Sequence, residues 1–211
     1  MKYFECQVTA VLALIIFVTT GCSNAQHGTP TTHIVTSGQA TSSAASTASS
    51  WPSDLPRIPE PIDVTPWVES PCKALTDGQL EELSIKSTPE PGEDPTGPGC
   101  NWGDLFEDGI TVGGNFGTKQ YSTIPGMYKN NETGFYSYFE PVTIAGYPAV
   151  FYSDAPDRGN GGCGIAIALR EDHTYGMGVR LNNDHANYDE PCSMLEDVAE
   201  MAVTTITEGG S

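Results

Sequence analysis

The chain has 211 residues, a formal net charge of −18 and a sequence pI near 4.2. A surface this acidic repels the phosphates of nucleic acids and the head groups of anionic lipids, so charge attraction to either is excluded. The length allows one domain with an extended additional segment.

The first 21 residues have the pattern of a lipoprotein signal peptide. Lys2 gives a weakly positive start, and residues 8–18 form an almost entirely apolar run, too short to span a bilayer as a helix. The run ends in Thr20-Gly21-Cys22, two small residues followed by a cysteine. We expect cleavage before Cys22, lipidation of Cys22 and anchoring to the cell membrane on its extracytoplasmic side. Secretion after cleavage nearby is the alternative.

Residues 22–66 are rich in Ser, Thr, Ala and Pro and lack a periodic apolar pattern. Such a segment cannot bury enough apolar surface to offset its ordering entropy, so a disordered tether is predicted. Prolines from Pro52 onward favour an extended arm. Trp51 is expected to be exposed, whereas Trp67 is expected to begin the folded domain, residues 67–208.

The ends of this domain are predicted to be helical. Thr76 and Gln79 have the spacing of a capping box before a short helix. Apolar residues recur at helical spacing between about 191 and 206, and Pro191 suits a first-turn position. Residues 89–99, rich in proline and acids, are predicted to be a loop.

Between the helices, alternating apolar residues predict strands. The predicted strands are 100–106 and 110–116, a hairpin over 141–152 that turns at Ala145-Gly146, and 164–170 with 174–181. A helix, a series of antiparallel strands and a second helix predict an α+β fold. We expect a single antiparallel sheet with an N-terminal and a C-terminal helix packed on it.

Four cysteines lie in the domain, namely Cys72, Cys100, Cys163 and Cys192. An even number outside the cytoplasm indicates two disulfides, for which three pairings are possible. We favour Cys72–Cys100 and Cys163–Cys192, because each joins a helix start to a strand start. Zinc binding is disfavoured because no Cys-x-x-Cys pair occurs.

The stretch 118–139 carries many aromatic residues but alternates poorly. Rings on a long loop over a rigid scaffold are suited to recognition. The candidate ligand-binding residues are Tyr121, Tyr128, Tyr136 and Tyr138. The alternative is that this loop folds back and its rings complete the core.

No pattern typical of a nucleophilic, phosphate-binding or zinc-dependent enzyme is present. Residues 183–190 concentrate oxygen ligands but lack calcium-loop spacing, so a solvated loop is favoured and no metal site is expected. We expect neither a cofactor nor an enzymatic activity, because no nucleophile, base and orienting group can be assigned.

Four segments together resemble the DUF3558 family of actinobacterial lipoproteins. They are Trp67–Asp77, which contains Pro71-Cys72-Lys73-Ala74-Leu75-Thr76-Asp77, then Gly99-Cys100-Asn101-Trp102, then Cys163, and finally Glu190-Pro191-Cys192-Ser193-Met194-Leu195. The resemblance covers residues 67–206. It implies a cell-envelope lipoprotein domain of unknown function and no catalytic residues.

A binding module for an envelope ligand or a partner protein, held at the membrane by Cys22, is therefore the favoured function. The alternatives are a structural or interaction lipoprotein of the cell envelope and, last, an enzyme without a recognisable motif. An apolar, ligand-sized concavity beside the sheet would favour small-molecule binding.

Overall fold

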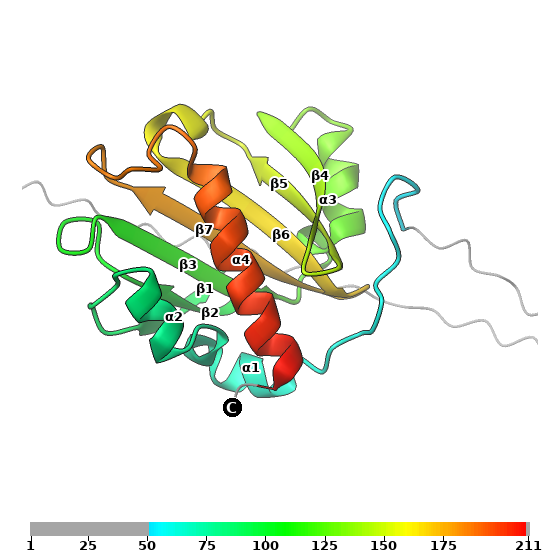
Figure 1. Ribbon diagram of the computed structural model, residues 1–211. Helices are drawn as coiled ribbons and strands as arrows, with labels where there is room; N and C mark the ends of the chain where they lie inside the picture. Colours follow the sequence, from blue (N-terminus) through cyan, green and yellow to red (C-terminus); the bar gives the residue numbers. More distant parts are fainter. Residues whose placement is uncertain (1–50, 210–211) are drawn as a thin grey trace, which may run out of the picture. The chain divides into compact units, whose positions relative to one another are not determined.

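The computed structural model describes residues 51–209 (Figure 1). The predicted signal peptide, Cys22 and most of the predicted tether lie outside the described residues. Within residues 51–209, no helix combines the length and the apolar character needed to cross a bilayer.

Seven strands form one antiparallel sheet in the order β1-β2-β3-β7-β6-β5-β4 (Figure 1). They are β1 (Glu90–Asp94), β2 (Gly97–Trp102), β3 (Ile110–Gly117), β4 (Tyr138–Ile144), β5 (Tyr147–Ser153), β6 (Gly162–Arg170) and β7 (His173–Leu181). The chain crosses from one edge to the centre with β1–β3. It then passes to the opposite edge and returns to the centre with β4–β7, so that β3 pairs with β7.

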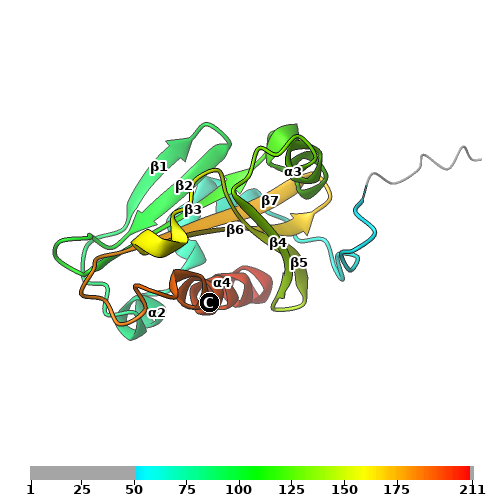
Figure 2. The ribbon, with the colours of Figure 1, turned by 90° about the horizontal axis from the view of Figure 1, so that it is seen from above.

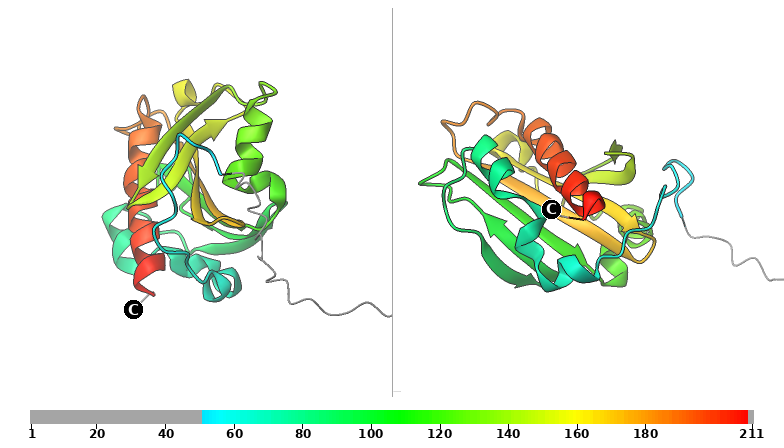
Figure 3. Two further views of the ribbon diagram at one scale, coloured as in Figure 1. Left: turned by 90° about the vertical axis from the view of Figure 1, so that its right-hand side faces the viewer. Right: turned by 60° about the horizontal axis from the view of Figure 1, so that its bottom comes forward.

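Over residues 51–209, four α-helices and three 3₁₀ turns accompany the sheet. They are α1 (Thr65–Glu69), η1 (Pro71–Ala74), α2 (Asp77–Glu82), η2 (Gln120–Ser122), α3 (Ile124–Asn131), η3 (Arg158–Asn160) and α4 (Pro191–Glu208). Figure 2 shows α2 and α4 on one side of the sheet and α3 on the other; the left view of Figure 3 shows the same separation of α4 from α3. We call the α4 side the helical face and the α3 side the open face.

The main core lies between the sheet and α4. Leu195, Val198 and Ala202 of α4 are fully buried, and they belong to one apolar cluster with Phe116 and Tyr175 of the central strands. The capping box at the start of α2 forms as predicted: Thr76 Oγ1 accepts from Gln79 N, and Gln79 Oε1 accepts from Thr76 N. The Gln79 amide also donates to the Met201 carbonyl at 3.0 Å, which ties α2 to α4.

Both predicted disulfides are present. Cys72 is bonded to Cys100, and Cys163 to Cys192, with Cα–Cα distances of 5.0 and 5.2 Å. The first joins η1 to β2 and the second joins β6 to the start of α4. The prediction of an α+β fold with one antiparallel sheet, a helix from each end of the domain packed on it and two disulfides is confirmed.

The prediction of a loop over residues 89–99 was wrong, because this stretch forms β1 and the beginning of β2. Every residue of β1 is exposed. An edge strand with both faces in solvent has no need for alternating apolar residues, so its sequence, Glu-Pro-Gly-Glu-Asp, carries no strand pattern. The strand expected over 100–106 ends instead at Trp102. Gly103 has a φ of 82°, in the left-handed region, and a turn follows.

The ordered domain begins earlier than residue 67. Trp51 is 8% exposed and packs with Leu55 in a second apolar cluster, on the open face. Further along, Ile62 N donates to the Leu169 carbonyl at 3.2 Å, and the chain then reaches the helical face with Val64 and Trp67. The expectations of an exposed Trp51 and of a tether extending to residue 66 were therefore wrong. The apolar residues of this segment are too widely spaced to form a local periodic pattern. They are buried only because they pack against the folded sheet and its helices.

The aromatic stretch 118–139 contains more regular structure than one helical turn. Thr123 accepts a hydrogen bond from Gly126 N and caps α3, an eight-residue helix with Pro125 in its first turn. Ile124 and Met127 of α3 are buried in the open-face cluster, against Val150, Ala166 and Ala168. The helix covers the β4–β6 side of the open face and leaves its centre uncovered.

A candidate ligand-binding groove

The open face contains a groove of about 830 Å³, within the range of small-molecule sites. It runs over the central strands, between the β1–β2 hairpin and the α3 region. Its lining comes from both halves of the chain, because β3 pairs with β7 in the middle of the sheet.

Glycines form the floor of this groove. Gly113, Gly178 and Gly164 are paired across β3, β7 and β6, so they form a row on one face. With strands about 4.8 Å apart, the row is about 10 Å wide. Gly176 and Ala166, on the same face, lie two residues along β7 and β6. An occupant can therefore approach the peptide groups of three neighbouring strands directly.

Two asparagine amides cover part of the floor. A Cβ atom at Gly113 would lie 3.3 Å from the Asn101 Oδ1, and one at Gly176 would lie 3.0 Å from the Asn115 Oδ1. Asn115 Nδ2 also donates to Thr96 Oγ1, which in turn donates to Asp94. In contrast, the nearest atom to a Cβ at Gly178 would be the Cys163 carbonyl oxygen, 3.6 Å away. The floor at Gly178 is therefore open.

The α3 side supplies an aromatic wall. Tyr121, Phe135, Tyr136 and Tyr152 line the groove, together with Met127 and Asn130 of α3. Tyr121 and Phe135 are 52% and 57% exposed, whereas Tyr136 packs edge-on against both Phe135 and Tyr152. Burial, and after it the neighbouring Tyr136 and Asp94, raise the pKa of Tyr152 to about 12, so this phenol stays neutral and can donate a hydrogen bond.

One end of the groove is closed by Tyr121. Its hydroxyl donates to the Pro95 carbonyl at 3.1 Å, which links η2 to the turn between β1 and β2. The other end carries Asp154, Asp157 and Arg180. The groove is thus a trough with one closed end, rather than a channel.

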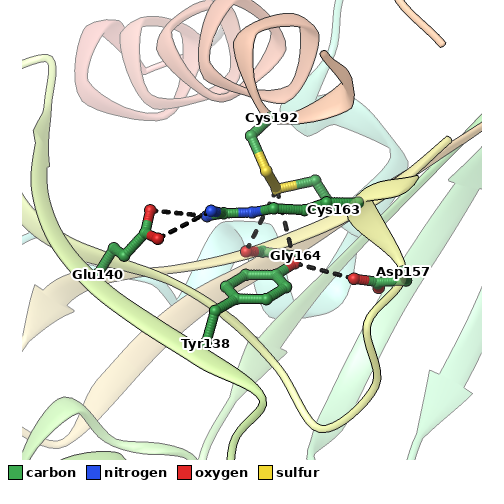
Figure 4. Close-up of polar contacts among 7 residues, drawn as sticks. Tyr138, Glu140, Asp157, Cys163, Gly164 and Cys192 are labelled. Carbon is green, nitrogen blue, oxygen red and sulfur yellow. Dashed lines mark hydrogen bonds and ion pairs between the residues drawn. A yellow bond between two sulfur atoms is a disulfide. The ribbon is translucent and has the colours of Figure 1, made fainter. Parts of the chain in front are cut away.

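The wall at the open end is held in place by polar contacts on the helical face (Figure 4). Arg158 forms a paired ion contact with Glu140, at 2.8 Å for both hydrogen bonds, and lies 3.8 Å above the Tyr138 ring. The Tyr138 hydroxyl donates to Asp157 at 3.1 Å, beside the Cys163–Cys192 disulfide. These contacts fix the 154–160 segment to β4. Hydrogen bonds from Arg158 lower the pKa of Glu140, whereas burial and Asp157 raise that of Tyr138.

The four predicted ligand-binding tyrosines do not all lie at the groove. Tyr121 and Tyr136 line the groove, but Tyr128 and Tyr138 do not. Tyr128 donates to Asp54 at 2.8 Å and packs edge-on against Phe139, so it holds the N-terminal segment against α3. Tyr138 belongs to the Arg158 contacts on the helical face. Within the aromatic stretch, Tyr128 therefore packs on a core, whereas Tyr121 and Tyr136 face the groove.

The glycine floor and the two asparagines were not among the predicted site residues. Their signal was present in β7, where Gly176 and Gly178 alternate with Tyr175, Met177 and Val179. An alternation of large apolar residues with glycine indicates one packed face and one bare face. The stretch 183–190 lies outside the groove lining. Within residues 51–209, no group of three or more His, Cys, Asp or Glu side chains could hold a metal ion.

Comparisons with curated proteins and with solved structures found no match to this chain. A family model for a protein of unknown function, DUF3558, matches residues 17–205, which is most of the chain. This match includes both disulfides, the whole sheet and all the residues that line the groove. The chain therefore belongs to the DUF3558 family.

Proposed function

We propose that the protein is a lipid-anchored, extracytoplasmic binding protein that holds its ligand in the open-face groove. The observation that carries this proposal is the uncovered glycine floor. Glycine weakens a strand interior because it has high backbone entropy and no side chain to pack, and it often marks a close approach by a ligand. A row of three glycines on the central strands therefore has a cost in stability that a bound ligand would explain.

Binding is favoured over catalysis by the chemistry of the lining. None of the histidines of residues 51–209 lines the groove, and both cysteines in its lining, Cys100 and Cys163, are in disulfides. Two serines line the groove. The Ser122 hydroxyl donates to the Lys119 carbonyl at 2.7 Å, and the Ser153 hydroxyl donates to Asp157 at 3.0 Å, with neither a histidine nor a lysine beside it among the described lining residues. A nucleophile, a base and an orienting group cannot be assembled from these residues.

The cellular location is part of the same proposal. Two disulfides suit an oxidising compartment, and the apolar run ending at Gly21-Cys22 suits a lipoprotein signal. Such a protein would face outward from the cell membrane, to which the lipid on Cys22 would attach it. The acidic chain itself contributes no attraction to anionic lipid.

The location is tested by replacing Cys22 with Ala and fractionating the cells. We expect the variant to leave the membrane fraction while the wild-type protein remains in it. Membrane association that is equal in both proteins would contradict the proposed anchor.

The binding role is tested by NMR on the full chain, with the amide signals of Gly113, Gly164 and Gly178 as reporters. We expect a fraction of cell-envelope extract to shift these signals in the wild-type protein. In Gly178→Leu, whose added side chain would fill the open part of the floor, the remaining reporters should not shift. Gly78→Ala is the matched control, because Gly78 lies on α2, away from the groove. Absence of any shift with every fraction would contradict a ligand-binding groove.

A further inference from the structure

We infer that the groove binds an uncharged oligosaccharide, an inference that rests on the proposed binding function. Three properties of the lining support it: the arrangement of charge, the hydrogen-bonding groups over the floor, and the shape made by glycines and aromatic rings.

Charge disfavours an anionic ligand. The lining contains four carboxylates, Glu93, Asp94, Asp154 and Asp157, and one guanidinium, that of Arg180. All four carboxylates and Arg180 lie within one residue of a strand end or beyond it. Two carboxylates already accept hydrogen bonds within the protein: Asp94 from Thr96, and Asp157 from Tyr138 and Ser153. A phosphate or a carboxylate in this groove would meet net negative charge.

Among the residues that the structure describes, no charged side chain lies in the middle of the groove. Between β2 and β5, the two central rows of the floor consist of Asn101, Gly113, Gly178, Gly164 and Tyr152, and of Gly99, Asn115, Gly176 and Ala166. Because no anion of residues 51–209 lies in the middle of the groove, a cationic ligand would be attracted only towards its ends and not to the floor. The groups that remain are amides and a phenol, each of which both donates and accepts hydrogen bonds. Hydroxyl groups also do both, so a polyhydroxylated ligand can pair with them in either direction.

The shape fits rings rather than chains of methylene groups. A floor of bare peptide groups about 10 Å wide is flat, and an aromatic wall of Tyr136, Tyr152 and Phe135 stands beside it. Sugar rings have apolar C–H faces that pack on such surfaces and hydroxyl edges that reach the amides. A lipid tail would instead cover the Asn101 amide and the Asn115 Oδ1 without pairing them, which is costly; only the Asn115 Nδ2 already has a partner, Thr96.

A peptide main chain is the nearest uncharged competitor, but the geometry does not favour it. Peptides gain main-chain hydrogen bonds by adding to a sheet edge. The groove lies on a sheet face, where the main-chain groups are already paired within the sheet. Both sheet edges also contain a proline and an acidic residue: Pro91 and Glu90 on β1, and Pro141 and Glu140 on β4. Such residues oppose strand addition.

The test is a titration of the full chain with defined probes, read at the amide signals of Gly113, Gly164 and Gly178. The probes are neutral tetrasaccharides of glucose, galactose and mannose, a tetralysine peptide, a tetra-alanine peptide and lysophosphatidylcholine below its micelle concentration. We expect at least one tetrasaccharide to shift the floor glycines. Its affinity should change less than about twofold between 50 and 500 mM salt, because no ion pair forms.

Two variants sharpen this test. Asn101→Asp keeps the shape but replaces the amide donor by a charge, and we expect affinity for the tetrasaccharide to fall about tenfold. Gly178→Val should abolish the shifts at Gly113 and Gly164 without loss of thermal stability, since no atom lies within 3.4 Å of the added Cβ. If the wild-type protein instead binds tetralysine at the floor glycines more tightly than any tetrasaccharide, the occupant is cationic and the inference is wrong.

The outcomes separate the two proposals. Shifts of the floor glycines by a peptide or by the lysolipid, with none by the tetrasaccharides, would overturn the saccharide class while leaving a binding groove in place. No shift by any probe or by envelope extract would overturn both.

Discussion

The two faces of the central strands use the same backbone in opposite ways. On the helical face, β3 and β7 present Val112, Phe116, Tyr175 and Val179, all buried beneath the helices. On the open face, the residues between them are Gly113, Gly176 and Gly178, with Asn115. Because side chains alternate along a strand, one face can be filled with large apolar groups while the other is left bare. The packed side chains of the helical face stabilise the fold, so the open face can carry small residues without loss of the main core.

The largest loss of stability is expected from a substitution on the helical face. Phe116 is fully buried and packs on Tyr175 with ring centroids 4.6 Å apart. We expect Phe116→Ala to lower the free energy of unfolding by about 3–5 kcal/mol, from lost burial and a new cavity. Chemical denaturation measures this. A loss below about 1 kcal/mol would mean that the helical face is not the main core.

The next largest loss of stability is expected on removal of the Cys163–Cys192 disulfide, which joins β6 to α4 across a sequence separation of 29. We expect the double change Cys163→Ala and Cys192→Ala to cost about 3 kcal/mol of unfolding free energy, through the larger entropy of the unfolded chain. Denaturation in non-reducing buffer measures it. The wild-type protein in reducing buffer is the control and should lose more, because it also loses Cys72–Cys100.

Two alanine variants with smaller expected losses of stability distinguish rings that pack in a core from rings that line the groove. Tyr128 contacts Phe139 and donates to Asp54, so Tyr128→Ala should lower the free energy of unfolding by about 1–3 kcal/mol. Tyr121 is half exposed, and Tyr121→Ala should change the free energy of unfolding by less than about 1 kcal/mol. The same Tyr121 variant should weaken ligand binding by opening the closed end of the groove. Equal losses of stability would contradict this division of the aromatic stretch.

Raising the pH above 10 should lower the free energy of unfolding by a similar or smaller amount, through the ionisation of Tyr152. Its pKa is raised to about 12 in the folded state, above the ordinary value near 10. The unfolded chain therefore loses this proton first, and stability that is complete below pH 10 declines as the pH rises from 10 towards 12. Tyr152→Phe should reduce the loss measured between pH 8 and pH 11 by roughly 1 kcal/mol. An unchanged pH dependence would mean that Tyr152 is not shielded from water.

The smallest effect on stability is expected at the groove floor. Gly178→Val adds a β-branched side chain to an open position in a strand and should raise the free energy of unfolding by up to about 1 kcal/mol. Gly164→Val is the contrasting variant, because its Cβ would lie 2.9 Å from the Tyr152 carbonyl oxygen and should destabilise the sheet. Thermal unfolding of both measures this. Destabilisation by Gly178→Val would show that the floor is not open there.

Local pattern by itself determined most of the helical face. The capping box of Thr76 and Gln79, the apolar period of α4, the hairpin at Ala145-Gly146 and the alternation in β6 and β7 each depend on residues close in sequence, so these elements were predictable. The disulfide pairing was also predicted from the expected starts of helices and strands, although Cys72 lies in η1 and Cys100 in the middle of β2.

Only the tertiary structure decided the rest, because the deciding contacts are remote in sequence. The edge strand β1 owes its form to pairing with β2 and not to its own residues. Trp51 is buried only because α3 and β5 lie beside it in space. The groove exists because β3 pairs with β7, which places Gly113 next to Gly178 and Asn115 next to Gly176 from opposite halves of the chain. A period of two can indicate a bare face on each strand, but register alone brings those faces together.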